Sequence, residues 1–305
     1  MMLEEILKHA DKMQATDIHF CPEANNYKAL FRIAGKLNLF IQQTSANLIN
    51  RLKMMADLDL SESRRTQEGQ FQSQINNKQY FIRVSIVATQ RGEKVALRLL
   101  QQQKTRTLNT LNLPADLAEI INKALILDSG LFLVCGATGA GKTTTLYACL
   151  DALNNGEKAI FTIEDPVEYE VDDYFQCEPQ LAINITPCKL LKSFMRQDPD
   201  IILIGELRDA ETAQLAIAAA LTGHLVFATL HSNSAIDAIH RMQSWQVDFF
   251  ALSSVISLIL HQKMHFREAK AEPIFCAIEP SWHLDSRPSN YQDLTQNRTF
   301  WHFYQ

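Results

Sequence analysis

A glycine-rich loop that ends in lysine and threonine places the strongest constraint on how this chain can fold. Residues 136–143 read G-A-T-G-A-G-K-T and satisfy the pattern G-x-x-x-x-G-K-S/T. The apolar run Leu131–Cys135 precedes the loop, and a helix-forming run that begins at Thr144 follows it. The chain has 10 glycines among 305 residues, and three of them lie in this loop, which makes a chance match in a glycine-rich region a poor explanation. The order strand, loop, helix predicts a phosphate-binding loop in a parallel α/β domain.

The backbone of this loop is expected to hold the phosphates of a nucleoside triphosphate. In loops of this kind the backbone N–H groups turn toward the β-phosphate, at a helix N-terminus that favours anions. Lys142 adds a positive charge for the β- and γ-phosphate oxygens, and the Thr143 hydroxyl is a ligand for Mg²⁺. The predicted ligands are therefore ATP and Mg²⁺, and the residues predicted to contact them are Gly136, Ala137, Thr138, Gly139, Ala140, Gly141, Lys142, Thr143 and Thr144.

Carboxylates follow two further predicted strands in the second half of the chain. The strands predicted at 159–163 and 201–204 are followed at once by Glu164 and Glu206. In a doubly wound sheet, ligands bind beyond the carboxyl ends of the strands, so both side chains are expected near the loop. Glu206 is predicted to hold Mg²⁺, in general through water, and Glu164 to polarise the attacking water, with Glu168 as a second candidate. The structural alternative is that both acids cap helices or lie in first helical turns, where negative charge is favoured.

Two histidines flank a third predicted strand, at 225–230. His224 precedes this strand and His231 follows it. Either side chain is expected to hydrogen-bond phosphate or to relay its presence, and His231 is the one counted among the catalytic candidates. A histidine whose hydrogen bonds serve only the structure is the alternative for both.

The charge balance argues against a protein that binds nucleic acid directly. Lys and Arg total 29 and Asp and Glu total 34, a formal net charge of −5 at pH 7, whereas proteins that bind phosphate backbones are in general basic. The 6 cysteines are scattered without a C-x-x-C pair, so we expect reduced thiols and no zinc site. The first residues include acidic side chains, whereas an export signal begins with basic ones. No stretch of about 18 residues is apolar enough to span a bilayer. These features predict a cytoplasmic location.

A change in the order of predicted strands and helices indicates that the chain has two domains. Residues 1–103 combine strand-like runs with two helical stretches, which predicts a smaller α+β domain with an antiparallel sheet. The polar run at 101–105 is the predicted linker. From 104 to 280, short β-branched runs alternate with helices, which predicts a parallel sheet covered by helices. Residues 281–305 show no clear periodicity and form a C-terminal tail that is either a packed extension or a flexible end.

Taken together, these segments resemble the type II/IV secretion ATPases, the traffic ATPases of secretion systems and type IV pili. The similarity covers about residues 5–265. In the first domain it rests on T-D-I-H at 16–19, R-x-Q-E-G at 65–69, R-V-S at 83–85, G-E-K at 92–94 and L-R-L-L at 97–100. In the second it rests on the phosphate loop, T-I-E-D-P-V-E-Y at 162–169, R-Q-D-P-D at 196–200, I-G-E-L-R-D at 204–209 and T-G-H-L-V-F-A-T-L-H at 222–231.

The resemblance implies a homohexameric ring of RecA-like P-loop ATPase domains. Each would be preceded by a smaller α+β domain of PAS-like type that packs over the nucleotide of a neighbouring subunit. Two arginines of that domain, Arg83 and Arg98, match the positions that family members use as charge partners of the phosphates. The resemblance also implies that ATP hydrolysis moves the two domains against each other and that this motion reaches a polytopic membrane platform protein. The ATPase would then be peripheral at the inner face of the membrane, held by its partners, without direct contact to nucleic acid.

Within the superfamily, the sequence is most similar to the ATPases that assemble a competence pseudopilus for DNA uptake. It shows neither the C-x-x-C zinc insertion of many large assembly ATPases nor the A-I-R-N-L-I-R-E signature of retraction motors, and we expect it to function without their extra N-terminal domain. Residues 255–264 are similar to the assembly-subfamily segment that ends in Q-R-L. Departures from the family pattern, none of which removes a catalytic group, occur at Ala34, Ala137, Ala140, Ser232 and Lys263. The alternatives are a low-turnover scaffold or regulator, a retraction motor, and a DNA translocase, against which the acidic balance argues.

Overall fold

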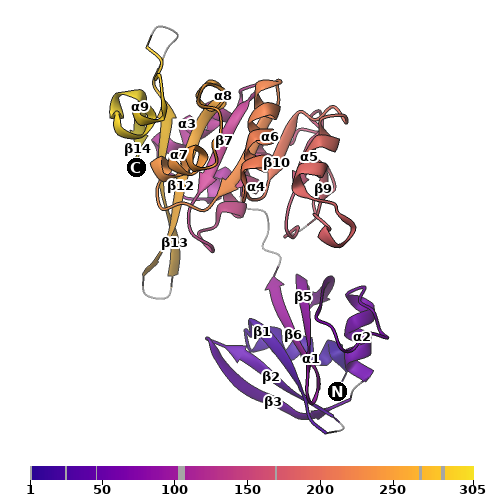
Figure 1. Cartoon of the computed structure of the whole chain (residues 1–305). Helices are drawn as coiled ribbons and strands as arrows, with labels where there is room; N and C mark the ends of the chain where they lie inside the picture. The colour runs from indigo at the N-terminus through magenta and orange to yellow at the C-terminus, as the bar shows by residue number, and fades with distance from the viewer. Residues whose placement is uncertain are drawn as a thin grey trace. The chain divides into compact units, whose positions relative to one another are not determined.

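The computed structural model of the chain describes residues 2–24, 26–45, 47–101, 107–168, 170–267, 270–282 and 286–305. The chain divides into two units, Met1–Gln103 and Lys104–Gln305, and each has its own sheet and its own apolar core (Figure 1). Of the linker predicted at 101–105, only Gln101 is among the described residues. None of the described helices is long and apolar enough to cross a membrane.

In the first unit, two helices pack on one face of a six-stranded antiparallel sheet. The strand order is β3-β2-β1-β6-β5-β4, and side chains alternate between the helix-covered core and the opposite, more polar face. The edge strand β3 has no counterpart in the sequence prediction, because its Leu37 and Leu39 are half exposed and do not form a core pattern. The elements are α1 (Leu3–Lys12), β1 (Asp17–Pro22), β2 (Tyr27–Ile33), β3 (Lys36–Thr44), α2 (Asn47–Met55), β4 (Gln67–Ile75), β5 (Lys78–Thr89) and β6 (Gly92–Gln101).

A buried carboxylate ties α1 to the β4–β5 hairpin. Asp11 accepts hydrogen bonds from Tyr80 Oη at 2.6 Å, from Asn76 Nδ2 at 2.7 Å and from Lys78 Nζ at 2.8 Å. Burial raises the pKa of the Asp11 carboxyl, but the three donors outweigh it and bring this pKa to about 2. The ionised form is therefore part of the folded structure of this unit.

The second unit is a three-layer α/β/α domain around an eight-stranded sheet of order β14-β13-β12-β7-β11-β10-β8-β9 (Figure 1). Helices α3 and α4 cover one face, and α5 to α8 cover the other. The predicted α/β fold is confirmed. The elements are α3 (Ala115–Leu125), β7 (Gly130–Cys135), α4 (Lys142–Leu153), β8 (Ile160–Ile163), β9 (Tyr174–Cys177), α5 (Pro187–Phe194), β10 (Ile201–Ile204), α6 (Ala210–Leu221), β11 (Leu225–Leu230), α7 (Ala235–Ser244), α8 (Phe249–Val255), β12 (Ile256–Arg267), β13 (Lys270–Pro280), α9 (Tyr291–Gln296) and β14 (Trp301–Tyr304).

One edge of this sheet departs from the parallel arrangement expected from the sequence. The six strands from β12 to β9 run parallel, whereas β13 pairs antiparallel with β12 and β14 pairs antiparallel with β13. The segment 281–305, expected as a tail, supplies β14 and α9 to this unit. Trp301 is 4% exposed and its Nε1 donates to Leu294 O at 2.8 Å, so residues 286–305 of this segment form a packed extension.

We expect Asp11→Asn to destabilise the first unit by about 1–2 kcal/mol at pH 7, because the amide cannot accept from all three donors. The folded pKa of Asp11 is depressed, so its stabilising contribution is complete above pH 4 and is lost as the pH falls toward 2. Urea unfolding of the full chain, followed by circular dichroism between pH 7 and pH 3, measures the difference. Glu23→Gln, which removes an exposed ion pair with Lys28, is the control and should change stability by less than about 0.5 kcal/mol. A difference between Asp11→Asn and the parent chain that does not shrink toward pH 3 would contradict this account.

Candidate active site

The phosphate loop begins where the central strand β7 ends, at Gly136. All residues of β7 are buried, and the strand lies between β11 and β12. A Cβ atom on Gly136 would lie 2.2 Å from the backbone oxygen of Gln262 on β12, and the φ angle of Gly136 is +149°. Any other residue type would therefore force β12 and the loop apart. Gln262 also accepts a hydrogen bond from Thr145 Oγ1 at 2.8 Å, which joins β12 to the first turns of α4.

Helix α4 begins without a capping side chain, unlike the helices on the opposite face of the sheet. Helices α5, α6, α7 and α8 each begin after a Thr, Asp or Ser whose side chain accepts a backbone N–H of the first turn. The N-cap of α4 is Gly141, with φ of +85° and no side chain to accept a hydrogen bond. The 12-residue helix therefore directs its first N–H groups and the positive end of its dipole at the loop, which is a site for an anion.

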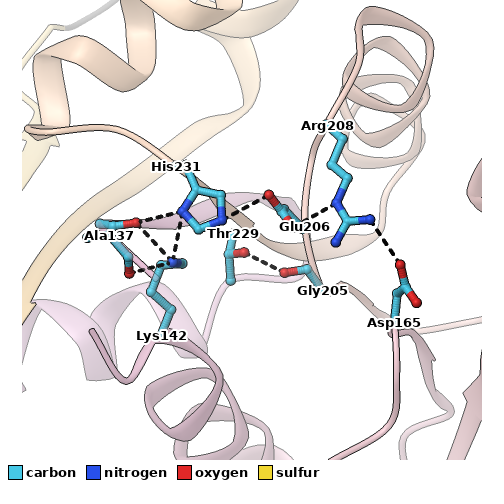
Figure 2. A network of polar contacts seen from close by, with 9 residues as sticks. Ala137, Lys142, Asp165, Gly205, Glu206, Arg208, Thr229 and His231 are labelled. Atoms are coloured by element: carbon cyan, nitrogen blue, oxygen red, sulfur yellow. Dashed lines mark hydrogen bonds and ion pairs between the residues drawn. The ribbon is translucent and has the colours of Figure 1, made fainter. Parts of the chain in front are cut away.

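Lys142 is folded back onto the loop that precedes it. Its Nζ donates to Gly136 O at 2.9 Å and to Ala137 O at 3.0 Å, and lies 3.4 Å from His231 Nδ1 (Figure 2). The residue is 9% exposed, and burial lowers its pKa while the nearby Glu206 carboxylate raises it. The ammonium group is thus held at the loop by weak carbonyl partners, which phosphate oxygens can replace.

A continuous chain of polar contacts runs from Lys142 across the carboxyl ends of three strands (Figure 2). His231 Nε2 lies 3.0 Å from Glu206 Oε1, and Arg208 Nε donates to Glu206 Oε2 at 2.8 Å. Arg208 Nη1 donates to Asp165 Oδ2 at 2.9 Å. With its proton on Nε2, His231 donates to Glu206 and can accept from Lys142 at Nδ1, whereas a proton on Nδ1 would be donated to Gly136 O, which lies 3.1 Å away. The structure thus brings Lys142, Glu206 and His231 together as the sequence analysis expected.

Thr143 and Glu206 carry oxygen atoms of the kind that Mg²⁺ prefers as ligands. The Thr143 hydroxyl belongs to the first turn of α4, and the Glu206 carboxylate follows β10. Among the residues that the structure describes, no group of three or more His, Cys, Asp or Glu side chains could hold a metal ion. Mg²⁺ bound together with substrate phosphates and waters needs only one or two protein ligands, so these two residues fit it.

Glu164 lies beneath α4 and not at the surface of the loop. It is 4% exposed, and its carboxylate accepts from Tyr147 Oη at 2.6 Å, Thr162 Oγ1 at 2.7 Å and Gln176 Nε2 at 3.2 Å. Burial raises the pKa of Glu164 above its ordinary value, although these donors lower it. A carboxyl group with a raised pKa suits a general base better than an ordinary one does. The second candidate, Glu168, is exposed.

His224 lies at the edge of the sheet opposite to the phosphate loop. Its backbone oxygen accepts from the N–H of Gly130, the first residue of β7, whereas the loop follows the last residue of β7. Six residues of strand separate the two edges by about 20 Å. His224 Nδ1 instead contacts Ala219 O at 2.9 Å and Thr222 Oγ1 at 3.2 Å, at the end of α6. Within one chain, the structure does not bring His224 to the predicted phosphate site.

Arg83 and Arg98 lie in the first unit, directly opposite each other on β5 and β6. The next residue in the same row is Asp17, which pairs with Arg98 on one side and Arg32 on the other. Arg98 Nε donates to Asp17 Oδ1 at 3.0 Å, and Arg32 Nε lies 3.7 Å from Asp17 Oδ2. Arg83 Nε is buried without a hydrogen-bond partner among the described residues. Three arginines therefore share one face of the sheet with one carboxylate.

Three residues of the second-unit site were given no role in the sequence analysis. Gln262 is far from the loop motif in the sequence, and Tyr147 lies inside an ordinary helix pattern. Their contacts form because β12 and the end of β8 lie next to α4. Arg208 is part of the I-G-E-L-R-D segment, which offered a signal: it is a cation two residues after a candidate carboxylate. Its ion pairs to Glu206 and Asp165 show that it belongs to the charged chain of the site.

The fold and this loop define the chain as a RecA-like P-loop protein. The family described as "Type II/IV secretion system protein" matches residues 1–279, and the chain belongs to this family. It is 39% identical over 267 residues to type II secretion system protein E of Klebsiella pneumoniae, which covers 86% of this chain and 54% of the relative. It is 37% identical to type II secretion system ATPase E of Vibrio cholerae, over 86% of this chain and 53% of the relative. The chain thus spans about half the length of the curated relatives it matches.

Solved structures share the fold over nearly the whole chain. The pilus retraction motor PilT with bound ADP has a TM-score of 0.73 and 25% sequence identity, and the match covers 98% of this chain and 87% of that one. The ATPase DotB of Legionella pneumophila has a TM-score of 0.73 and 21% identity, over 96% of this chain and 85% of that one. At 21% identity the second similarity supports the fold alone. Both agree with a RecA-like domain that follows a strand-rich first unit.

We expect Gly136→Ala to abolish binding of a triphosphate, because the added Cβ would collide with the backbone of Gln262 and move the loop. Binding of a fluorescent, slowly hydrolysed ATP analogue measures the effect, and a loss of at least about tenfold in affinity is expected. The control is Gly156→Ala, a glycine with φ of +78° and no atom within 4 Å of the added Cβ, which should bind normally. Unchanged affinity in Gly136→Ala would show that the phosphates lie elsewhere.

We expect Glu164→Gln to change how stability depends on pH. The folded pKa of Glu164 is raised, so the parent chain loses stability as the pH rises from the unfolded value through the folded one. The amide does not titrate, and the melting temperature of the variant relative to the parent should therefore increase between pH 5 and pH 8. Glu157→Gln, at an exposed position, should show no such trend. A constant difference across this pH range would mean that Glu164 is not held in a desolvated site.

Proposed function

We propose that this chain is an ATP-hydrolysing motor subunit that drives the assembly of a type IV pilus-like filament. The observation that carries the proposal is the contact chain at the carboxyl edge of the second sheet. There Lys142 and Glu206 are joined through His231, next to a helix N-terminus that has no capping side chain. A positive charge, an anion-binding backbone and a carboxylate at one edge are the parts that phosphoryl transfer requires.

Each residue has a defined part in the proposed reaction. Lys142 exchanges its carbonyl partners for the β- and γ-phosphate oxygens, and the N–H groups of the loop hold the phosphates in place. Thr143 and Glu206 would hold Mg²⁺, which when bound supplies charge stabilisation to the phosphates. Glu164 orients and polarises the attacking water, for which its carboxylate must become accessible. His231 contacts both Lys142 and Glu206, so its hydrogen bonds respond when either of them binds phosphate or metal.

The first unit would complete the site of a neighbouring subunit in a homohexamer. Arg83 and Arg98 lie opposite each other, and like charges in such a pair repel unless an anion neutralises them. Asp17 neutralises part of this charge, and a triphosphate from a neighbouring subunit would neutralise the rest. Although burial raises it, the pKa of Asp17 is held below its ordinary value by hydrogen bonds from Thr16 and Arg98. Hydrolysis would remove the γ-phosphate and weaken this attraction, which gives a physical basis for movement between the units.

The partner would be a polytopic membrane platform protein, with the motor peripheral at the inner face of the membrane. The relatives named as type II secretion proteins support a pseudopilus that serves protein secretion. The absence of a C-x-x-C pair in the sequence favours the finer proposal, a competence pseudopilus that takes up DNA. Deletion of the gene, with separate assays of protein secretion and of transformation, distinguishes the two. Loss of filament retraction instead of assembly would identify a retraction motor.

We expect Lys142→Ala and Glu206→Ala each to lower the rate of ATP hydrolysis by at least about 100-fold, because each removes charge that stabilises the transferred phosphoryl group. Release of inorganic phosphate by the purified chain, with and without lipid and partner, measures the rate. Lys189→Ala, an exposed lysine on α5, is the control and should hydrolyse at the parent rate. If both variants at the site still support filament assembly in cells, the chain is a scaffold or regulator and the motor proposal fails.

A further inference from the structure

Helix α4 connects the phosphate loop to the buried carboxylate of Glu164. The helix begins at Lys142, and Tyr147 lies one and a half turns further on. Tyr147 is 1% exposed, and its hydroxyl oxygen lies 2.6 Å from Glu164 Oε2. The same short helical segment therefore carries the lysine of the loop and a direct partner of the candidate base.

The direction of the hydrogen bonds around Glu164 is fixed by the chemistry of its neighbours. Gln176 Nε2 can only donate, and it contacts both Glu164 Oε1 at 3.2 Å and the Tyr147 hydroxyl oxygen at 2.9 Å. The Tyr147 oxygen thus accepts from Gln176 and gives its own proton to Glu164. The Thr162 hydroxyl donates to Glu164 Oε1 at 2.7 Å. Three donors converge on the carboxylate, so the arrangement stabilises the ionised form.

Burial works in the opposite direction. Glu164 is 4% exposed, and transfer of a carboxylate from water to such a site favours the protonated form. A base that is protonated cannot accept a proton from water, so the donors decide whether this carboxylate is usable near neutral pH. Tyr147 is the donor of the shortest of the three hydrogen bonds and the only one of the three that belongs to α4.

We propose that Tyr147 is a positioning residue that keeps Glu164 ionised and oriented for its task as the general base. This inference rests on the proposed function, because it gives the Tyr147–Glu164 hydrogen bond a role in ATP hydrolysis. Tyr147 touches neither phosphate nor water in this role and acts only through Glu164. Because it belongs to α4, any displacement of this helix when the loop binds phosphate also changes the hydrogen bond to the base.

The test is Tyr147→Phe, which removes one oxygen atom and leaves the ring in the core. The acid limb of the pH profile for kcat/KM should move to higher pH by about one unit, because one donor to a charged carboxylate is lost. Hydrolysis at pH values below this limb's midpoint should fall by up to about tenfold and approach the parent rate at higher pH, while KM for ATP stays within about twofold. A residue that only supports the fold would lower the rate equally at every pH.

The matched control is Tyr304→Phe. It also removes a hydrogen bond from a tyrosine hydroxyl to a glutamate, from Tyr304 to Glu279 at 2.8 Å, but at the opposite edge of the sheet. Its pH profile should be that of the parent chain. If Tyr304→Phe shifts the acid limb as Tyr147→Phe does, the shift does not report on Glu164 and the proposal is overturned.

A measurement without turnover separates this inference from the proposed function. The carboxyl carbons of ¹³C-labelled glutamates are titrated by NMR, and the Glu164 signal is identified by its absence in Glu164→Gln. Its midpoint should lie at higher pH in Tyr147→Phe than in the parent chain, and an unchanged midpoint overturns the inference even if the chain hydrolyses ATP. Conversely, a shifted midpoint in a chain that does not hydrolyse ATP supports the hydrogen bond and overturns the proposed function.

A double variant keeps the inference testable if Tyr147→Phe folds poorly. The free energy of unfolding of Tyr147→Phe/Glu164→Gln is compared with that of Glu164→Gln alone. Equal values support action of Tyr147 through Glu164, and a lower value for the double variant contradicts it.

Discussion

The close approach of two backbones, at Gly136 on the loop and Gln262 on β12, is the constraint on which the rest of the site depends. A Cβ at Gly136 would lie within 2.2 Å of the neighbouring backbone oxygen, so the loop can begin only with glycine. Strand β12 also holds α4 from the side, through Gln262 and Thr145. The start of α4 is thereby fixed relative to the sheet, and an anion at its N-terminus meets N–H groups that are already oriented. Preorganised donors of this kind need no rearrangement when phosphate arrives.

Charged groups at the carboxyl edge of the sheet satisfy one another through direct contacts. Positive and negative groups alternate along the chain of contacts from Lys142 through Glu206 and Arg208 to Asp165, with His231 between the first two. Arg208 and Asp165 are each about 60% exposed, so solvent screens that end of the chain, whereas Lys142 is buried. Exchange of partners at the buried end is therefore where ligand binding has the most effect.

Local patterns in the sequence predict much of this architecture, and the misses have a common physical origin. The strand, loop and helix around Lys142 follow from periodicity and the glycine spacing, and the strand-end rule correctly places Glu206 and His231 at the same edge. The same rule is insufficient for Glu164, because the direction of its side chain depends on donors from α4 and β9 that no local pattern reveals. The position of His224 follows from the direction of β11. His224 precedes this strand, and residues before a parallel strand lie at the sheet edge opposite to the one where ligands bind.

Partners that come from distant segments are similarly invisible in the sequence. Gln262 follows Gly136 by 126 residues, and the parallel pairing of β12 with β7 brings the two together. The segment 281–305 lacks periodicity because its contribution is one edge strand and a short helix, each too short to establish a pattern. Its packing becomes clear only when Trp301 is seen buried against α9.

The two units differ in how completely their polar groups are satisfied, and this difference bears on how they would work together. In the second unit, Lys142 and Glu164 have their hydrogen bonds within the unit. On the polar face of the first unit, Arg83 Nε and both ring nitrogens of His19 are buried without a hydrogen-bond partner among the described residues. Burial and nearby cations, first among them Lys94, lower the pKa of His19, which keeps this face from gaining still more charge. Buried polar atoms without partners cost free energy, and an anion from another molecule would remove that cost. Among the described residues, unsatisfied buried nitrogens of basic side chains therefore lie on the polar face of the first unit, which is where a bound anion would have the largest effect.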